Sequence, residues 1–289
     1  MKLTENSLAL KRVSASAEPA APGIRRTPEI AKLVDISRCI GCKACEVACK
    51  AWNDLEAEET FNFGSYQSHQ DLSPNTWLLM RFNEIEIDGD VHWLIKKDAC
   101  LHCEEPGCLL ACPSPGAIVQ YENGIVDFNQ ENCIGCQYCV AGCPFDIPRF
   151  NAKTRKVYKC NLCIDRVEAG LEPACVKTCP TQAISYGTKE DMVMLAKEKL
   201  SVLNERGYGN AMLYDPAGVS GTHMMYVVPH GDQLVAYQLP ENPVAKRGAI
   251  SALGLFKQIG AYMFGAGILA TALHFLAVGP DRPDDEQGG

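Results

Sequence analysis

The sequence has no glycine-rich phosphate loop, no two-histidine zinc motif and no arrangement of residues typical of acyl transfer. Nothing in it predicts a substrate site, so we expect no catalytic residue and no enzymatic activity of the isolated chain. An excess of basic residues is also absent: 27 Lys and Arg stand against 35 Asp and Glu, a net charge of −8 over 289 residues. This balance argues against a nucleic-acid partner, which would need a clustered basic face.

The first residues lack the continuous apolar stretch of a Sec-type signal peptide, so we expect none here. Arg25 and Arg26 form an arginine pair, but no hydrophobic segment follows them, and we expect no export signal there either. Residues 14–28 are rich in Ala, Pro and Ser and cannot bury much surface alone. We therefore predict an extended N-terminal arm over residues 1–27, which is either a loose tail or lies along a partner subunit.

A long uncharged run occurs near the C-terminus, where residues 259–279 comprise 21 positions without a formal charge. A helix of this length is about 31 Å long, the thickness of a bilayer core. Ala261 and Gly265 are spaced four apart, which lets another membrane helix approach closely. We predict a transmembrane helix with its flank over residues 246–280, in contact with the lipid bilayer through residues 259–279. A buried helix of a soluble domain is the alternative.

Sixteen cysteines are too many for ordinary core packing, and they fall into four groups of four. Zinc ribbons use two cysteine pairs per metal and leave no longer run of cysteines. Spacings this short are also poorly suited to disulfides. The four groups are Cys39, Cys42, Cys45 and Cys49; Cys100, Cys103, Cys108 and Cys112; Cys133, Cys136, Cys139 and Cys143; and Cys160, Cys163, Cys175 and Cys179.

The first and third groups match the run of bacterial ferredoxins, in which three cysteines hold one 4Fe–4S cluster and the fourth ligates a neighbouring cluster. Sixteen ligands therefore predict four 4Fe–4S clusters, in pairs that exchange their fourth ligands. Each oxidised cluster with four thiolates carries a charge of about −2. Residues 149–177 contain seven basic against three acidic side chains, a net charge of +4, and such charges adjust reduction potentials.

Hydrophobic patterning predicts further elements around these groups. Two strands are expected over residues 77–95 around a turn at 88–89, and a hairpin over 117–128 around Asn123 and Gly124. A helix is predicted over 189–206, a strand over 222–229 and a linker over 231–247. These later elements form either a docking surface or core packing.

With these motifs, the sequence closely resembles the iron–sulfur beta subunits of membrane-bound respiratory formate dehydrogenases of the formate dehydrogenase-N type. The resemblance covers roughly residues 28–280. The cysteine pattern alone is less specific, because electron-transfer subunits of several reductases and some hydrogenases share it. The segments that carry the resemblance include VDISRCIGCKACEVACKAWND, LHCEEPGCLLACPSPGAIVQYENGIVDF, CIGCQYCVAGCPFDIPR, YKCNLCIDRVEAGLEPACVKTCPTQAI and GVSGTHMMYV.

The resemblance implies which cysteines hold each cluster. All sixteen are present, so no three-iron cluster is expected. The implied ligands are Cys39, Cys42, Cys45 and Cys179 for cluster 1; Cys49, Cys160, Cys163 and Cys175 for cluster 2; Cys100, Cys103, Cys108 and Cys143 for cluster 3; and Cys112, Cys133, Cys136 and Cys139 for cluster 4.

The fold implied by the resemblance is α+β, with a duplicated ferredoxin-like domain for two clusters and one C-terminal transmembrane helix. The first domain would be discontinuous and the second would lie within it. The expected division is residues 28–58 and 157–190 for the first domain, 99–156 for the second, 59–98 for an inserted hairpin region, 191–245 for a docking region and 281–289 for an acidic tail.

By the same resemblance, cluster 1 faces a molybdenum- or tungsten-pterin alpha subunit that oxidises formate. Cluster 4 faces a membrane cytochrome b gamma subunit that reduces quinone. The chain would be an electron-transfer subunit in the bacterial inner membrane, with its cluster domain in the periplasm. Basic residues before the helix favour the opposite orientation, but that rule is weak for a domain folded before export. The alternative is an equivalent four-cluster subunit of another membrane oxidoreductase, such as a hydrogenase or a molybdopterin reductase.

Overall fold

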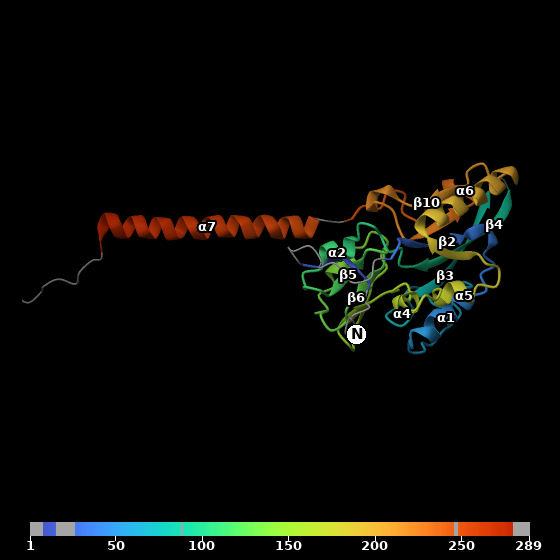
Figure 1. Cartoon of the computed structure of the whole chain (residues 1–289), viewed down its shortest axis with the longest axis horizontal. Helices are drawn as coiled ribbons and strands as arrows, with labels where there is room; N and C mark the ends of the chain where they lie inside the picture. The colour runs from blue at the N-terminus through green and yellow to red at the C-terminus, as the bar shows by residue number, and fades with distance from the viewer. Residues whose placement is uncertain (1–7, 16–26, 88, 246–247, 280–289) are drawn as a thin grey trace, which may run out of the picture. The chain divides into compact units, whose positions relative to one another are not determined.

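The computed structural model describes residues 8–15, 27–87, 89–245 and 248–279. The chain forms two compact units, Met1–Lys246 and Arg247–Gly289, which are considered separately. Within the first unit, β5, β6 and α2 lie at one end and β2, β10 and α6 at the other (Figure 1). The predicted acidic tail at 281–289 and residues 1–7 and 16–26 of the predicted arm lie outside the described residues.

A four-stranded sheet forms the centre of one end of the first unit. Its strands, in spatial order, are β10 (Met212–Tyr214), β11 (Met224–Val228), β2 (Ile30–Asp35) and β9 (Ile184–Thr188). The strand β2 is parallel to β11 and antiparallel to β9, and every residue of β2 and β11 is buried. Strand β11 confirms the strand predicted over 222–229.

Helix α6 (Lys189–Glu205) packs on this sheet and confirms the helix predicted over 189–206. The side chain of Thr188 begins it by accepting a hydrogen bond from the backbone N–H of Asp191 at 3.1 Å. Its Met192, Ala196 and Leu203 side chains are buried in one cluster with residues of β2 and β11. Residues 191–245 therefore supply core packing, one of the two alternatives left open by the sequence.

A three-stranded sheet at the other end consists of β1 (Leu10–Val13), β5 (Ile118–Tyr121) and β6 (Val126–Phe128) in that order. Strands β5 and β6 confirm the hairpin predicted around Asn123 and Gly124. Strand β1 pairs antiparallel with β5, and Leu8 and Ala9 before it are buried. Neither alternative for the arm holds over residues 8–15, because this segment packs on a sheet of its own chain.

Two hairpins complete the strands of the first unit. Strands β3 (Leu78–Ile87) and β4 (Asp90–Ala99) pair antiparallel along their whole length, which confirms the two strands predicted over 77–95. Strand β4 leads directly into Cys100. The shorter hairpin joins β7 (Arg149–Asn151) and β8 (Lys156–Tyr158), which leads into Cys160.

Short helices accompany the cysteine groups. Helix α1 contacts α5, and α2 contacts α3. A Cβ atom on Gly107 of α2 would lie 2.3 Å from the backbone oxygen of Gly142 in α3, so glycine permits this close crossing. The helices and 3₁₀ turns are α1 (Ala44–Trp52), α2 (Gly107–Ala111), α3 (Tyr138–Gly142), α4 (Ile164–Glu168), α5 (Ala174–Lys177), η1 (Ile36–Arg38), η2 (Ala217–Val219) and η3 (Gly231–Gln233).

The second unit contains α7 (Gly248–Val278), a helix of 31 residues that lies within the range 246–280 predicted for the helix with its flank and begins before the uncharged run at residue 259. Among the residues that the structure describes, no helix is long and apolar enough to cross a membrane. The predicted transmembrane helix is therefore not confirmed.

Candidate iron–sulfur sites

The loops that carry the first and third cysteine groups have the same local conformation. Gly41 and Lys43 have φ angles of 65° and 62°, and the equivalent Gly135 and Gln137 have φ angles of 70° and 63°. Most L-residues rarely adopt these left-handed angles, so the shared sequence Cys-Ile-Gly-Cys specifies a defined curve of the chain. The first two cysteines of each group lie on this curve and the third lies in the first turn of the helix that follows, α1 or α3.

One cavity brings together the first three cysteines of the chain with a distant fourth. Cys179 comes from the end of the fourth group, two residues after α5, yet it lines the same cavity as the first loop. Met80 of β3 and Lys97 of β4 complete its inner wall. The cysteines that line it are Cys39, Cys42, Cys45 and Cys179.

A second cavity has the equivalent composition in the other half of the unit. Cys143, at the C-terminal end of α3, reaches the loop of the second group. Lys159, Val126 and His102 also line this cavity. The cysteines that line it are Cys100, Cys103, Cys108 and Cys143.

For the remaining eight cysteines, the electrostatic effects between thiols indicate which side chains lie near one another. Burial raises the pKa of Cys49 well above its usual value, and the nearby thiols of Cys160, Cys175 and Cys163 raise it further. Burial also raises the pKa of Cys139 to about 12, with additional effects of Cys112, Cys133 and Cys136. The two cavities each contain one of the cysteine sets that the resemblance implies, and the assignment of all sixteen ligands to clusters stays a prediction.

All sixteen thiols are free, and most are buried. Burial raises the pKa of Cys45 to about 12 and that of Cys163 to about 11, because water no longer stabilises the thiolate. The thiolate is the form that binds metal, and a bound metal ion itself stabilises the thiolate. Cys160 is the exception: burial raises its pKa, but Lys32, Lys97 and Lys159 outweigh burial and lower it.

None of these three lysines is predicted from the sequence as part of a site. Lys32 and Lys97 are each 1% exposed and Lys159 is 5% exposed, whereas lysine is normally a surface residue. The available signal is their context: Lys32 stands inside the apolar run Ile-Ala-Lys-Leu-Val, and Lys159 directly precedes a cysteine. Lys159 also belongs to the basic segment 149–177, of which Lys153 and Lys177 are exposed.

An unpartnered buried group tests whether a cluster fits the second cavity. His102 is fully buried, and its Nδ1 accepts a hydrogen bond from the backbone N–H of Val126 at 3.1 Å. The proton of the neutral ring therefore resides on Nε2, which has no hydrogen-bond partner among the described residues. A 4Fe–4S cluster has sulfur acceptors for such a donor, and four thiols line the cavity. The residues present therefore fit the group.

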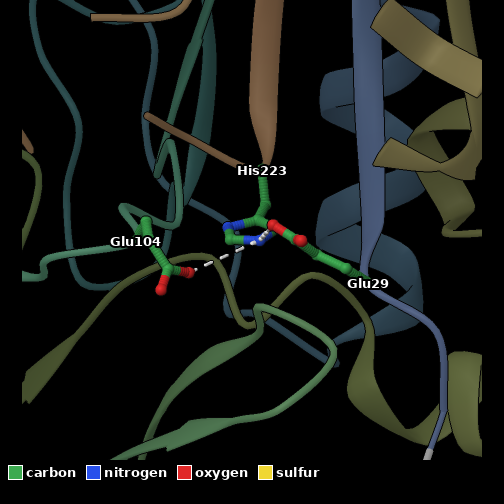
Figure 2. Close-up of side chains that lie close together, drawn as sticks. All are labelled: Glu29, Glu104 and His223. Carbon is green, nitrogen blue, oxygen red and sulfur yellow. Dashed lines mark hydrogen bonds and ion pairs between the residues drawn. The ribbon is translucent and has the colours of Figure 1, made fainter. Parts of the chain in front are cut away.

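Glu29, Glu104 and His223 form a further polar cluster (Figure 2). The Nε2 atom of buried His223 lies 2.8 Å from Oε1 of Glu29 and 4.0 Å from Oε2 of Glu104. Lys189 pairs with Glu29 at 3.5 Å, and Lys11 pairs with Glu104. Because a lysine already neutralises each carboxylate, we interpret this cluster as a structural ion-pair network.

Comparisons with known proteins agree with the cysteine geometry. Two family models, both described as a 4Fe–4S dicluster domain, match residues 38–117 and 91–189. The chain is 55% identical over 260 residues to the formate dehydrogenase-O iron–sulfur subunit of Escherichia coli, which covers 90% of this chain and 87% of that protein.

Two further relatives have similar coverage. The iron–sulfur subunit of the nitrate-inducible formate dehydrogenase of Escherichia coli is 53% identical over 262 residues, covering 90% of this chain and 89% of the relative. The formate dehydrogenase iron–sulfur subunit of Haemophilus influenzae is 51% identical over 269 residues, covering 92% and 86%. The similarity thus extends well beyond the segments that contain the cysteines.

Proposed function

This chain belongs to the family of formate dehydrogenase iron–sulfur subunits, and from this membership we propose that it carries electrons from a formate-oxidising subunit to a quinone-reducing membrane subunit. Oxidation of formate to carbon dioxide releases one proton and two electrons. Reduction of a quinone to a quinol takes up two electrons and two protons. The chain links the two reactions as an electron-transfer subunit without a catalytic residue of its own.

We propose that the four sets of cysteines hold one 4Fe–4S cluster each. When bound, each cluster accepts and releases one electron at a time. Cys39, Cys42, Cys45 and Cys179 hold cluster 1; Cys49, Cys160, Cys163 and Cys175 hold cluster 2; Cys100, Cys103, Cys108 and Cys143 hold cluster 3; and Cys112, Cys133, Cys136 and Cys139 hold cluster 4. The supporting observations are the two cavities, the mutual effects of the thiols and the orphaned Nε2 atom of His102.

The observation that supports two docking ends is the exposure of one cysteine loop at each end of the series, and the direction between them follows the family resemblance. Cys42 and Cys136 are exposed, whereas the cysteines of cluster 2 are all buried. Ile40 beside Cys42 is 63% exposed and Ile134 beside Cys136 is 64% exposed. Exposed apolar side chains next to a redox site are typical of a docking surface. We assign the loop of Cys42 to the pterin-containing alpha subunit and the loop of Cys136 to the cytochrome b gamma subunit.

The proposed attachment to the bacterial inner membrane is a single pass through residues 259–279, with the cluster domain in the periplasm. It is supported by the absence of formal charge in that segment and by the exposed apolar side chains of α7, among them Phe264, Leu269 and Leu276. Carbonate extraction of membranes tests the attachment, and protease treatment of spheroplasts tests the orientation. Release by carbonate would contradict the attachment, and protection of the cluster domain in spheroplasts would contradict the periplasmic location.

The proposed function is tested by electron paramagnetic resonance on the purified native complex under anaerobic conditions. Formate is expected to produce the signals of reduced 4Fe–4S clusters, as dithionite does. Signals that arise with dithionite but not with formate would show that the clusters are present and that formate is not the electron source. Complete absence of signals, with zinc in place of iron, would contradict the cluster assignment.

A further inference from the structure

Two adjacent buried lysines of β4 have opposite surroundings. Lys96 is 3% exposed, and its Nζ lies 3.1 Å from Oδ1 of Asp98. Lys97 is 1% exposed, and no carboxylate oxygen lies within 4.0 Å of its Nζ among the described residues. Alternation along the strand turns the two side chains to opposite faces. Lys97 lines the cavity of Cys39, Cys42, Cys45 and Cys179, and its Nζ lies 3.3 Å from Sδ of Met224.

The other two unpaired lysines occupy equivalent positions beside cysteines. The Nζ atom of Lys32 lies 4.0 Å from Sγ of Cys175. Lys159 lines the cavity of Cys100, Cys103, Cys108 and Cys143, and its Nζ donates hydrogen bonds to the carbonyl oxygens of Val126 at 2.5 Å and Cys160 at 2.9 Å. Lys159 therefore stands between the cavity of one cysteine set and the backbone of another set.

A buried lysine without a carboxylate partner is costly, because its charge is removed from water. Cysteines that bind a cluster do so as thiolates, and these thiolates would supply the opposite charge to the lysines. Lys159 lines the cavity of Cys100 and donates to the carbonyl oxygen of Cys160, so it is placed where clusters 2 and 3 would add further negative charge.

We propose that Lys32, Lys97 and Lys159 are fixed internal cations that raise the reduction potentials of the clusters beside them. Lys159 acts on both cluster 2 and cluster 3. The proposal rests on the cluster assignment above. Each added electron makes a cluster more negative, so a nearby buried cation stabilises the reduced form more than the oxidised form. In a medium of low effective dielectric this preference is larger than it would be in water.

Lys97→Met, with Lys96→Met as its matched control, tests the proposal. Both changes remove a buried ammonium group from the same strand, but only Lys97 lines a cysteine cavity. The variants are purified as whole complexes and titrated with dithionite and redox mediators, with electron paramagnetic resonance as the readout. We expect Lys97→Met to lower the ratio of reduced to oxidised cluster 1 or 2 at least tenfold at a fixed potential, a shift of about 59 mV for a one-electron couple. Lys96→Met should leave the ratio unchanged.

Lys159→Met repeats the test between clusters 2 and 3. Its control is Lys153→Met, at an exposed position of the β7–β8 hairpin that precedes Lys159. Here clusters 2 and 3 should both shift, and Lys159→Arg should restore their potentials. If the cluster reduction potentials of Lys97→Met and Lys159→Met equal those of their controls, the proposal is overturned. The lysines would then contribute only to packing. Where a methionine variant assembles no clusters, iron content becomes the readout, and failure of the arginine variant to restore iron overturns the proposal. Because dithionite replaces formate, these results do not depend on the proposed electron donor.

Discussion

The outer and inner cysteine sets of this chain use the same ligands in different surroundings. The loops of Cys42 and Cys136 reach the surface and carry exposed apolar residues. The set of Cys49, Cys160, Cys163 and Cys175 is buried throughout. The outer sets are exposed enough to contact a partner subunit, whereas the inner sets are shielded from solvent. The difference shows that equivalent cysteine spacings can stand in exposed or in buried surroundings, which the rest of the fold determines.

Charge follows this division only in part. Lys32 and Lys159 lie beside inner cysteines, whereas Lys97 lines the cavity of the outer set of Cys42, and none of the three has a carboxylate within ion-pair distance among the described residues. At the outer set of Cys133, the nearest lysine contact is that of Lys156, a partly exposed residue whose Nζ donates to the carbonyl oxygen of Cys133. Water can stabilise charge at an exposed cluster, but only protein groups can do so at a buried one.

The largest expected effect comes from removing an inner ligand. Cys160→Ala should prevent assembly of the subunit, because it leaves buried lysines without their compensating charge, at a cost of about 3–5 kcal/mol for an unpaired buried ion. Cys42→Ala should lose only the signal of cluster 1. Iron content and the yield of purified complex measure the difference. Equal yields for the two variants would contradict the division into inner and outer sets.

A second pair of variants tests the exchange of ligands between sets. Cys175 and Cys179 are four residues apart around α5, yet they line different sites. Cys179→Ala should alter the spectrum of the cluster of Cys39, Cys42 and Cys45. Cys175→Ala should alter that of the cluster of Cys160 and Cys163. Loss of the Cys160 cluster alone in Cys179→Ala would show that the pairing is wrong.

A moderate effect is expected at the crossing of α2 and α3. Gly107→Ala places a methyl group against the backbone oxygen of Gly142 and should reduce stability by about 1–3 kcal/mol. Gly209→Ala is the control, because a Cβ atom there meets nothing within 4 Å. The temperature at which the absorbance near 400 nm is lost measures both changes. A similar temperature for the two variants would indicate that the crossing tolerates a side chain.

The smallest expected effect concerns the ion-pair network of Glu29. Burial raises the pKa of Glu29, but His223 and Lys189 outweigh burial and lower it below 4.5. Its contribution to stability is therefore fully present above pH 4.5 and is lost as the pH falls through the lower value in the folded state. Glu29→Gln should destabilise the protein at pH 6 and make no difference at the lowest pH at which the fold persists. A loss of stability in Glu29→Gln that is the same at every pH would contradict its assignment to the ionised carboxylate of Glu29.

The sequence predicts the features that depend on neighbouring residues. The cysteine groups, the turn at Asn123 and Gly124, and helix α6 with Thr188 at its start all have short-range signals, and the structure contains the hairpin and the helix. The return of Cys179 to the first loop is implied by resemblance and not by spacing, because contacts across more than a hundred residues leave no local pattern.

Two features show where local patterns fail. Strand β1 forms because β5 has a free edge, and no residue near 8–15 indicates that partner in the sequence. The burial of Lys97 beside equally buried Lys96 depends on which face of β4 meets the cysteines, and this is set by tertiary packing.

The central claim is that electrons enter at the exposed loop of Cys42, cross the buried sets and leave at the loop of Cys136. It is tested most directly by adding formate to two variant complexes and recording electron paramagnetic resonance at low temperature. In Cys136→Ala, formate should still reduce clusters 1, 2 and 3. In Cys42→Ala, formate should reduce none of the remaining clusters, although dithionite reduces them. Equal reduction of the inner clusters by formate in both variants would contradict a single path with its entry at Cys42.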